Sequence, residues 1–133
     1  MKPETREHVA KASRCLVKAR AELAVATNEP TVAEDAARNA YYAAFHAAQA
    51  LIFERTGKTA KTHAGVHREF HRLARHEVTL PVQLRSFITT SYELKAKADY
   101  EASTADPVTL ARATTSIATS ERFVDAIVNL RPP

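Results

Sequence analysis

The sequence predicts an all-α protein, and its composition provides three reasons. The 133 residues include only two glycines and no tryptophan, alanine recurs throughout, and runs of β-branched residues are few, all of which favours helices over strands. A chain of this length buries roughly two-thirds of its unfolded surface, enough for one real core. We therefore expect a single domain over residues 1–133, folded as an up-and-down helical bundle of four long helices and one short helix.

The first expected helix runs from Pro3 to about Thr27 and is amphipathic. Its apolar residues recur at spacings of three and four, at Val9, Ala12, Leu16, Ala19, Leu23 and Ala26. The segment 28–30 ends it. Cys15 lies beside this stripe, so we expect a small buried core residue; as the only cysteine it cannot form an internal disulfide.

The second expected helix, from Thr31 to Thr56, is the centre of the bundle. Thr31 and Glu34 have the capping-box spacing, and Gly57 is placed to close the helix in the left-handed conformation. One stripe of this helix is apolar and an adjoining stripe is polar and aromatic. The first stripe holds Tyr41, Phe45, Ala48 and Ile52, and the second holds Asn39, Tyr42, His46, Gln49 and Phe53. Alanines around them let neighbouring helices approach, so the polar groups are expected to be held in place.

A short basic loop then leads into a third, short helix that ends near Arg75. A fourth helix begins at Pro81, where proline suits the first helical position. Its inward stripe places one charged residue among apolar and small ones, at Leu84, Phe87/Ile88, Ser91, Lys95 and Ala98. The last helix follows Asp106 as N-cap and Pro107, with an inward stripe at Leu110, Thr114, Ile117, Val124 and Ile127/Val128.

The net charge of +4 is concentrated in one segment. Between Lys61 and His76, four Lys or Arg and one Glu give a local charge of +3, which suits an anionic partner. No apolar run approaches the roughly eighteen residues that a membrane span needs, and the N-terminus lacks the apolar segment of a signal peptide. We expect a cytoplasmic protein without membrane association.

Lys61, Thr62 and His63 stand at the start of the third helix, where free backbone N–H groups and the helix dipole favour an anion. His63, His67 and His71 are also spaced i, i+4, i+8, as metal ligands on a helix can be. The nearby carboxylate, Glu69, points elsewhere, so neither a metal nor a cofactor is expected. The helix face of His67 and His71 is then either solvated or in contact with phosphate.

Lys95, Asp99 and Tyr100 form a second polar group, with Lys95 and Asp99 one helical turn apart. They are either a structural ion pair or part of a site, because an unpaired charge on the inward stripe would be costly. His46 has the same two interpretations, a satisfied core histidine or a functional one. Two glycines and one cysteine exclude the glycine-rich nucleotide loop, the Gly-x-Ser-x-Gly elbow and paired-cysteine sites.

Three motifs in order resemble a known family. They are Tyr41-Tyr42-Ala43-Ala44-Phe45-His46-Ala47-Ala48, then Lys61-Thr62-His63-Ala64-Gly65-Val66 with Phe70, then Tyr92 and Lys95 followed by Ala98-Asp99-Tyr100-Glu101. In these, over about residues 10 to 128, the chain resembles the small stand-alone HEPN-domain proteins of prokaryotes. The resemblance implies a bundle of four long helices with a short extra one. It also implies nucleotide binding, and kinship with ribonuclease toxins or with partners of small nucleotidyltransferases.

The chain departs from the nuclease members of that family. Those members carry an arginine, four to six residues, and then a histidine, whereas Arg38 and His46 are separated by seven. Eight positions turn a helix roughly 80° beyond two full turns, so these two side chains should diverge. Lys95 stands where relatives commonly have arginine, which retains charge but loses the planar fork for phosphate. Whether the chain is an enzyme is therefore left open.

We expect a homodimer that binds a nucleotide or RNA-like anion and works with a partner nucleotidyltransferase in a toxin–antitoxin-like module. The expected binding residues are Tyr42, His46, Lys61, Thr62, His63, Lys95, Asp99 and Tyr100. One alternative is a metal-independent ribonuclease toxin with His46 or His63 as general acid or base and a lysine as its cation. Another is a non-catalytic interaction module.

Overall fold

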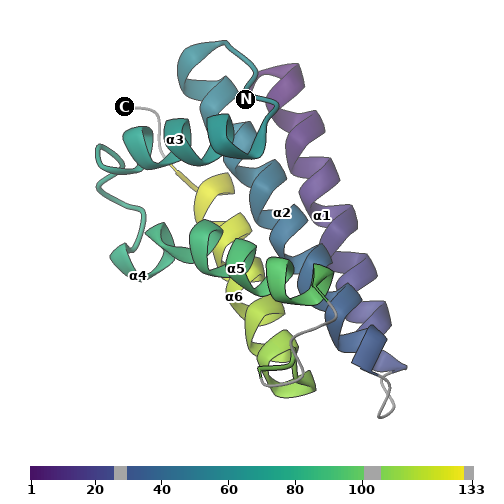
Figure 1. Ribbon diagram of the computed structural model, residues 1–133. Helices are drawn as coiled ribbons and strands as arrows, with labels where there is room; N and C mark the ends of the chain where they lie inside the picture. The colour runs from purple at the N-terminus through teal and green to yellow at the C-terminus, as the bar shows by residue number, and fades with distance from the viewer. Residues whose placement is uncertain (26–29, 101–105, 131–133) are drawn as a thin grey trace.

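The computed structural model describes residues 1–25, 30–100 and 106–130, and in these ranges it contains helices and no strand. The helices are α1 (Pro3–Ala24), α2 (Pro30–Thr56), α3 (His63–Ala74), α4 (Val82–Arg85), α5 (Phe87–Asp99) and α6 (Leu110–Val128) (Figure 1). The predicted all-α fold is confirmed. None of these helices combines the length and apolar character needed to cross a membrane.

The second helix is central, as its sequence predicts. It packs against α1, α3, α5 and α6. In Figure 1, α1 and α2 lie side by side along the length of the molecule, while α3 and α5 lie over one side of this pair. The predicted core stripe of Tyr41, Phe45, Ala48 and Ile52 is fully or almost fully buried.

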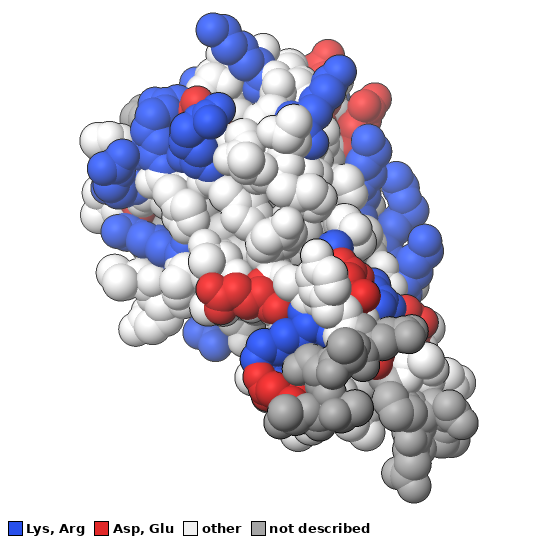
Figure 2. All heavy atoms as spheres, in the orientation of Figure 1, with Lys and Arg blue, Asp and Glu red and all other residues white. Residues whose placement is uncertain are grey.

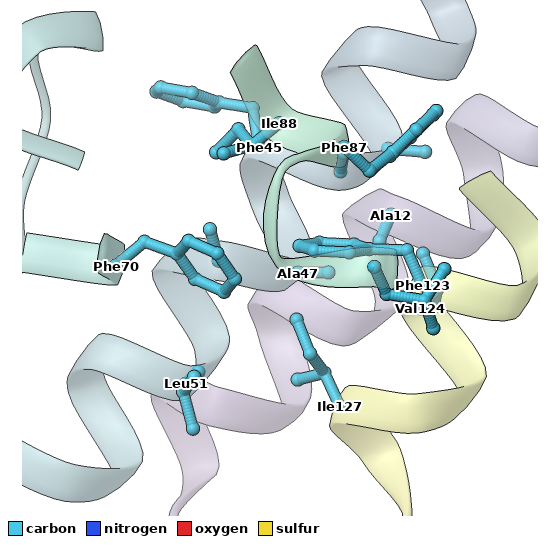
Figure 3. Packing of buried hydrophobic residues seen from close by; sticks show 14 of the residues in the cluster. Ala12, Phe45, Ala47, Leu51, Phe70, Phe87, Ile88, Phe123, Val124 and Ile127 are labelled. Atoms are coloured by element: carbon cyan, nitrogen blue, oxygen red, sulfur yellow. The ribbon is translucent and has the colours of Figure 1, made fainter. Parts of the chain in front are cut away.

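The core is built from aromatic, aliphatic and small residues. Phe123 of α6 lies with its ring centroid 5.3 Å from that of Phe70 and 5.8 Å from that of Phe87 (Figure 3). Small residues hold α6 close to α2, and the Ser120 hydroxyl donates a 2.8 Å hydrogen bond to the Ala40 carbonyl. Cys15 is partly buried and packs against this core.

Two of the expected helix starts are wrong. α2 begins at Pro30, so Thr31 lies in its first turn and is not the N-cap. α6 begins at Leu110 after Thr109, whose hydroxyl accepts the Arg112 N–H at 3.1 Å. Asp106 does not cap this helix, because its carboxylate pairs with the side chains of Lys97 and Arg112.

Helix ends elsewhere agree better with the sequence. α1 ends at Ala24, short of the expected Thr27, which lies outside the described residues. Gly57 closes α2 with φ +71°, as predicted, and its N–H donates to the Phe53 carbonyl at 2.8 Å. A left-handed residue after the last turn satisfies a carbonyl that would otherwise lack a partner.

The expected fourth helix is split into α4 and α5 by a turn at Ser86. Phe87 and Ile88, the first two residues of α5, are both buried. In α6, Ile117, Val124 and Ile127 of the predicted stripe are buried, but the buried face is rotated away from Leu110 and Val128, which are exposed. Small hydroxyl residues, among them Ser116 and Ser120, are buried on this helix as well. Ser120 permits close packing against α2 through its hydrogen bond to the Ala40 carbonyl.

Candidate functional site

A tyrosine hydroxyl joins two histidines at the contact between α2 and α3. The Tyr41 hydroxyl lies 2.7 Å from Nδ1 of His63 and 2.9 Å from Nε2 of His67. Tyr41 is fully buried. The two histidines are one turn apart on α3, so both rings reach the same atom of the central helix.

Further rings surround these three. Tyr92 of α5 has its ring centroid 5.1 Å from Tyr41, 5.4 Å from His63 and 5.1 Å from His67. Tyr42 lies 5.5 Å from Tyr41 and 6.5 Å from His63. We call these five residues the tyrosine–histidine cluster. It reaches the surface, because Tyr92 is 38% exposed.

A lysine and a carboxylate border the cluster. Nζ of Lys95 lies 5.7 Å from the ring centroid of Tyr42 and 6.0 Å from that of Tyr92, and it pairs with Asp99. Asp99 also accepts a 2.8 Å hydrogen bond from Nε of Arg38. Burial of Asp99 raises its pKa, but hydrogen bonds from Lys95 and Arg38 outweigh this and the pKa is lowered. Asp99 therefore stays ionised and holds the lysine in place.

The environment keeps the histidines neutral near pH 7. Burial lowers the pKa of His63, and the charge of Lys95 lowers it further. The pKa of His67 is lowered by burial and then by His71 and His63. Burial raises the pKa of Tyr41, so its hydroxyl remains protonated. Neutral imidazoles beside a fixed cation can accept or donate protons.

A basic pocket of about 510 Å³ lies on the other side of the start of α3. It is lined by basic, hydroxyl and small side chains and one carboxylate: Ile52, Thr56, Lys58, Thr59, Ala60, Lys61, Thr62, Gly65, Arg68, Glu69 and Arg72. Figure 2 shows Lys and Arg atoms grouped over α3 next to a broad area of uncharged atoms. Four cations and one carboxylate give the pocket a net positive charge, suited to phosphate.

The start of α3 separates the predicted Lys61, Thr62 and His63 group into two environments. Lys61 and Thr62 line the basic pocket, whereas the His63 side chain turns to Tyr41. Thr62 is the N-cap of α3, and its hydroxyl accepts the Gly65 N–H at 3.0 Å. A Cβ on Gly65 would lie 2.8 Å from that hydroxyl oxygen, so a larger residue here would force the Thr62 side chain to shift.

His46 lies apart from the cluster, on the side of α2 that faces α1. Its Nδ1 is 2.9 Å from Oε1 of Gln49, whose Nε2 donates to the Ala60 carbonyl at 2.9 Å. Its pKa is lowered by burial first and by Lys11 and Arg14 of α1, although the Gln49 bond opposes the shift. The sequence placed His46 with Tyr42 because the two share a stripe. Tyr42 is at the edge of that stripe nearest α5, and His46 at the edge nearest α1.

Arg38 and His46 diverge, as their spacing predicts. Arg38 contacts Asp99 and the Ala98 carbonyl of α5. Tyr100 follows α5 as its C-cap and is 73% exposed. The structure thus brings Tyr42, His63, Lys95 and Asp99 together, and leaves Tyr100 at the surface.

The sequence interpretation of His67 as part of a solvated or phosphate-contacting face is wrong, since this ring turns inward onto Tyr41. His71 is exposed and lies 3.1 Å from the Thr89 hydroxyl. Within the described ranges, no group of three or more His, Cys, Asp or Glu side chains is arranged to hold a metal ion.

Sequence reasoning missed the roles of Tyr41 and His67 here, and the contribution of Lys58 and Arg72 to the pocket. A signal for His67 was present, because His63 and His67 share a helix face. The sequence analysis considered a metal, solvent or phosphate at that face, because nothing in the sequence shows that a buried tyrosine of another helix lies opposite.

The fold and this site define a small all-α domain with a half-buried cluster of tyrosines and histidines beside a basic pocket. The chain belongs to the HEPN domain family, whose model matches residues 5–130. It is also 40% identical over 93 residues to a protein of Methanocaldococcus jannaschii named "Putative toxin MJ0605". That match covers 70% of this chain and 66% of the relative, just under two thirds of its length.

Proposed function

We propose that this protein binds a nucleotide or RNA-like anion and acts with a small nucleotidyltransferase in a toxin–antitoxin-like module. The observation that carries the proposal is the position of the basic pocket at the same helix start as the tyrosine–histidine cluster. Lys61 and Thr62 line the pocket, while the adjacent His63 belongs to the cluster. The name of the archaeal relative supports the module.

In this proposal the pocket holds phosphate and the cluster holds the base or ribose. Lys58, Lys61 and Arg68 make no ion pair with other described residues, so their charges are available to a ligand. Arg72 is partly neutralised by Glu69, at 2.8 Å. The exposed Tyr92 ring and the half-buried Tyr42 ring offer faces on which a base can stack.

Titration with RNA oligomers and ATP between about 50 and 200 mM salt tests the binding. Two or three phosphate contacts predict a log–log slope of affinity against salt of about −2. The double variant Lys61→Ala/Arg68→Ala should bind at least ~10-fold more weakly and with a shallower slope.

The matched control is Lys18→Ala/Arg122→Ala, which removes the same charge from exposed positions outside the pocket. It should retain nearly all binding. Equal binding by the two double variants would mean that the affinity arises from net charge alone, and no binding by the wild type at low salt would favour the interaction module.

The partner and the oligomeric state have separate tests. Co-expression with a nucleotidyltransferase encoded beside this chain should give a complex that elutes together in size-exclusion chromatography. Sedimentation of the isolated chain should give the mass of a homodimer. A monomeric chain that does not bind the nucleotidyltransferase would leave only the proposed binding of a nucleotide or RNA-like anion.

A metal-independent ribonuclease is a second candidate, favoured by the two hydrogen-bonded histidines beside Lys95. Here His63 is the general acid or base and Lys95 the cation that stabilises the phosphorane charge. His46, the other catalytic candidate, lies by α1 away from that lysine. RNA cleavage should persist in EDTA and fall at least ~100-fold in His63→Ala but not in His46→Ala.

A further inference from the structure

A single hydroxyl proton serves two histidine nitrogens in the tyrosine–histidine cluster. Tyr41 Oη lies 2.7 Å from His63 Nδ1 and 2.9 Å from His67 Nε2. A phenol can donate one hydrogen bond, and it accepts others through its oxygen. When it donates to one ring, the second contact requires an N–H of the other ring. Of the two nitrogens that face Tyr41, one therefore carries a proton and one does not.

This constraint links the tautomers of the two neutral rings. His63 presents Nδ1 to the hydroxyl, whereas His67 presents Nε2. If Tyr41 donates to His63, both rings carry their proton on Nε2; if it donates to His67, both carry it on Nδ1. Mixed tautomers would put a proton on both facing nitrogens, which leaves the phenolic proton without an acceptor, or on neither, which leaves one ring nitrogen without a donor. Either case loses a hydrogen bond in a buried location.

The same geometry accommodates one added proton and resists a second. A proton added to the outer nitrogen of the ring that already donates to Tyr41 leaves both hydrogen bonds intact. Two imidazolium rings would both donate to the one oxygen and leave the phenolic proton without an acceptor. They would also repel each other, and the charge of Lys95 of α5 beside His63 adds to this. The other titratable groups that face the two rings are Tyr42 of α2 for His63, and His71 of α3 and Tyr92 of α5 for His67.

We propose that Tyr41 couples His63 and His67 into one acid–base pair that shares a single proton, so that one ring is an acid while the other is a base. Tyr41 is the positioning residue of this pair. His63 and His67 are both partly exposed. Their outer nitrogens, Nε2 of His63 and Nδ1 of His67, are the ring atoms left to exchange protons with a ligand, because the inner nitrogens face Tyr41.

As a catalytic device the pair rests on the ribonuclease function proposed above. In the neutral pair, the ring that donates to Tyr41 has a free outer nitrogen, which takes the proton of a ribose 2′-hydroxyl as the 2′-oxygen bonds to phosphorus. The other ring gives its outer proton to the 5′-oxygen as the P–O5′ bond breaks. The inner proton of the first ring passes to the Tyr41 oxygen while the phenolic proton moves to the second ring. Both rings end neutral in the other matched tautomer, without net change in Tyr41.

Nitrogen-15 NMR of the histidine side chains in the free protein tests the coupling without any RNA. The wild type should show the same tautomer for His63 and His67 at high pH. On acidification the two rings should titrate together in two steps more than about 1 pH unit apart. In Tyr41→Phe the tautomers should become independent and the steps should move closer. His71→Gln, which leaves both hydrogen bonds to Tyr41, should keep the matched tautomers.

Opposite tautomers in the wild type would overturn the proposal, as would independent titration of the two rings. Both readings come from the wild-type protein, so they decide the matter even if Tyr41→Phe fails to fold. Failure to bind or cleave RNA would refute the proposed function while leaving the matched tautomers in place, so the two failures can be told apart.

Discussion

Lys95 shows how one residue can be both structural and at the border of a candidate site. Its side chain is 14% exposed, and the ammonium group lies near the rings of Tyr42 and Tyr92. Burial works against its charge, but the hydrogen bond to Asp99 raises its pKa overall. The sequence was consistent with either a structural ion pair or a role in a site. The geometry is compatible with both, because the ion pair with Asp99 fixes the Lys95 ammonium group at the edge of the tyrosine–histidine cluster.

Replacement of Lys95 by alanine should cost about 1–3 kcal/mol of stability, less than for a fully buried ion pair. The loss is reduced because Asp99 is 36% exposed and retains Arg38. Lys95→Met keeps the stem against the rings and should recover part of it. Chemical denaturation measures all of these.

Lys97→Ala is the matched control, since Lys97 and Asp106 are paired with side chains 35% and 53% exposed. It should cost under about 1 kcal/mol. If Lys95→Ala cost no more than this control, Lys95 would behave as an ordinary surface lysine.

At the scale of the element, the start of α3 positions both candidate features. Thr62 ends the basic loop and caps the helix through Gly65, which directs Lys61 to the pocket and His63 to Tyr41. The sequence was sufficient to place basic residues and a capped helix start near this turn. It could not show that adjacent residues 62 and 63 face different environments, because that depends on how α3 crosses the central helix.

Thr62 and Gly65 should be energetically coupled. Thr62→Ala removes the cap and should cost about 1 kcal/mol. Gly65→Ala should change stability little in the wild type, because the gain in helix propensity is offset by the contact of its Cβ, 2.8 Å from the Thr62 hydroxyl oxygen. In the Thr62→Ala background the same change should stabilise by about 1 kcal/mol.

A double-mutant cycle measures this difference, which should be about 1 kcal/mol. Additive effects of the two substitutions would show that a Cβ at position 65 does not oppose the Thr62 cap. The Thr109 cap of α6 provides the comparison, since Arg112 rather than glycine donates to it; Thr109→Ala should cost about as much as Thr62→Ala.

At the scale of the whole molecule, alanine periodicity and two glycines were enough to predict the class of fold and its central helix. Helix ends that depend on local chemistry, such as Gly57, were also predictable. The split at Ser86 and the rotated face of α6 were not, because both arise from packing between distant elements. The surroundings of His46 were not predictable either. They depend on which side of α2 carries this residue, and that side faces Lys11 and Arg14 of α1.

Burial of histidines throughout the bundle predicts sensitivity to acid. The pKa values of His8, His46, His63 and His67 are all lowered, with burial as the largest cause in each. Nδ1 of His8 is buried and has no hydrogen-bond partner among the residues that the structure describes, so a proton there gains nothing in return. The unfolded chain, with histidine pKa values near 6.5, binds protons more readily than the folded one.

Stability should therefore be full above about pH 7 and should fall as the pH drops through about 6.5 toward the lower folded-state pKa values. Asp99, whose pKa is lowered by Lys95 and Arg38 despite burial, adds a further loss only below about pH 4, where its unfolded form binds a proton. Melting temperatures from pH 8 to 5 at constant ionic strength measure the first loss. His46→Gln keeps a polar side chain and removes one of the four groups, so its melting temperature should depend less on pH than that of the wild type. A wild-type melting temperature that is constant or rises between pH 7.5 and 5.5 would contradict the lowered histidine pKa values, and with them the neutral rings on which the Tyr41 pair depends.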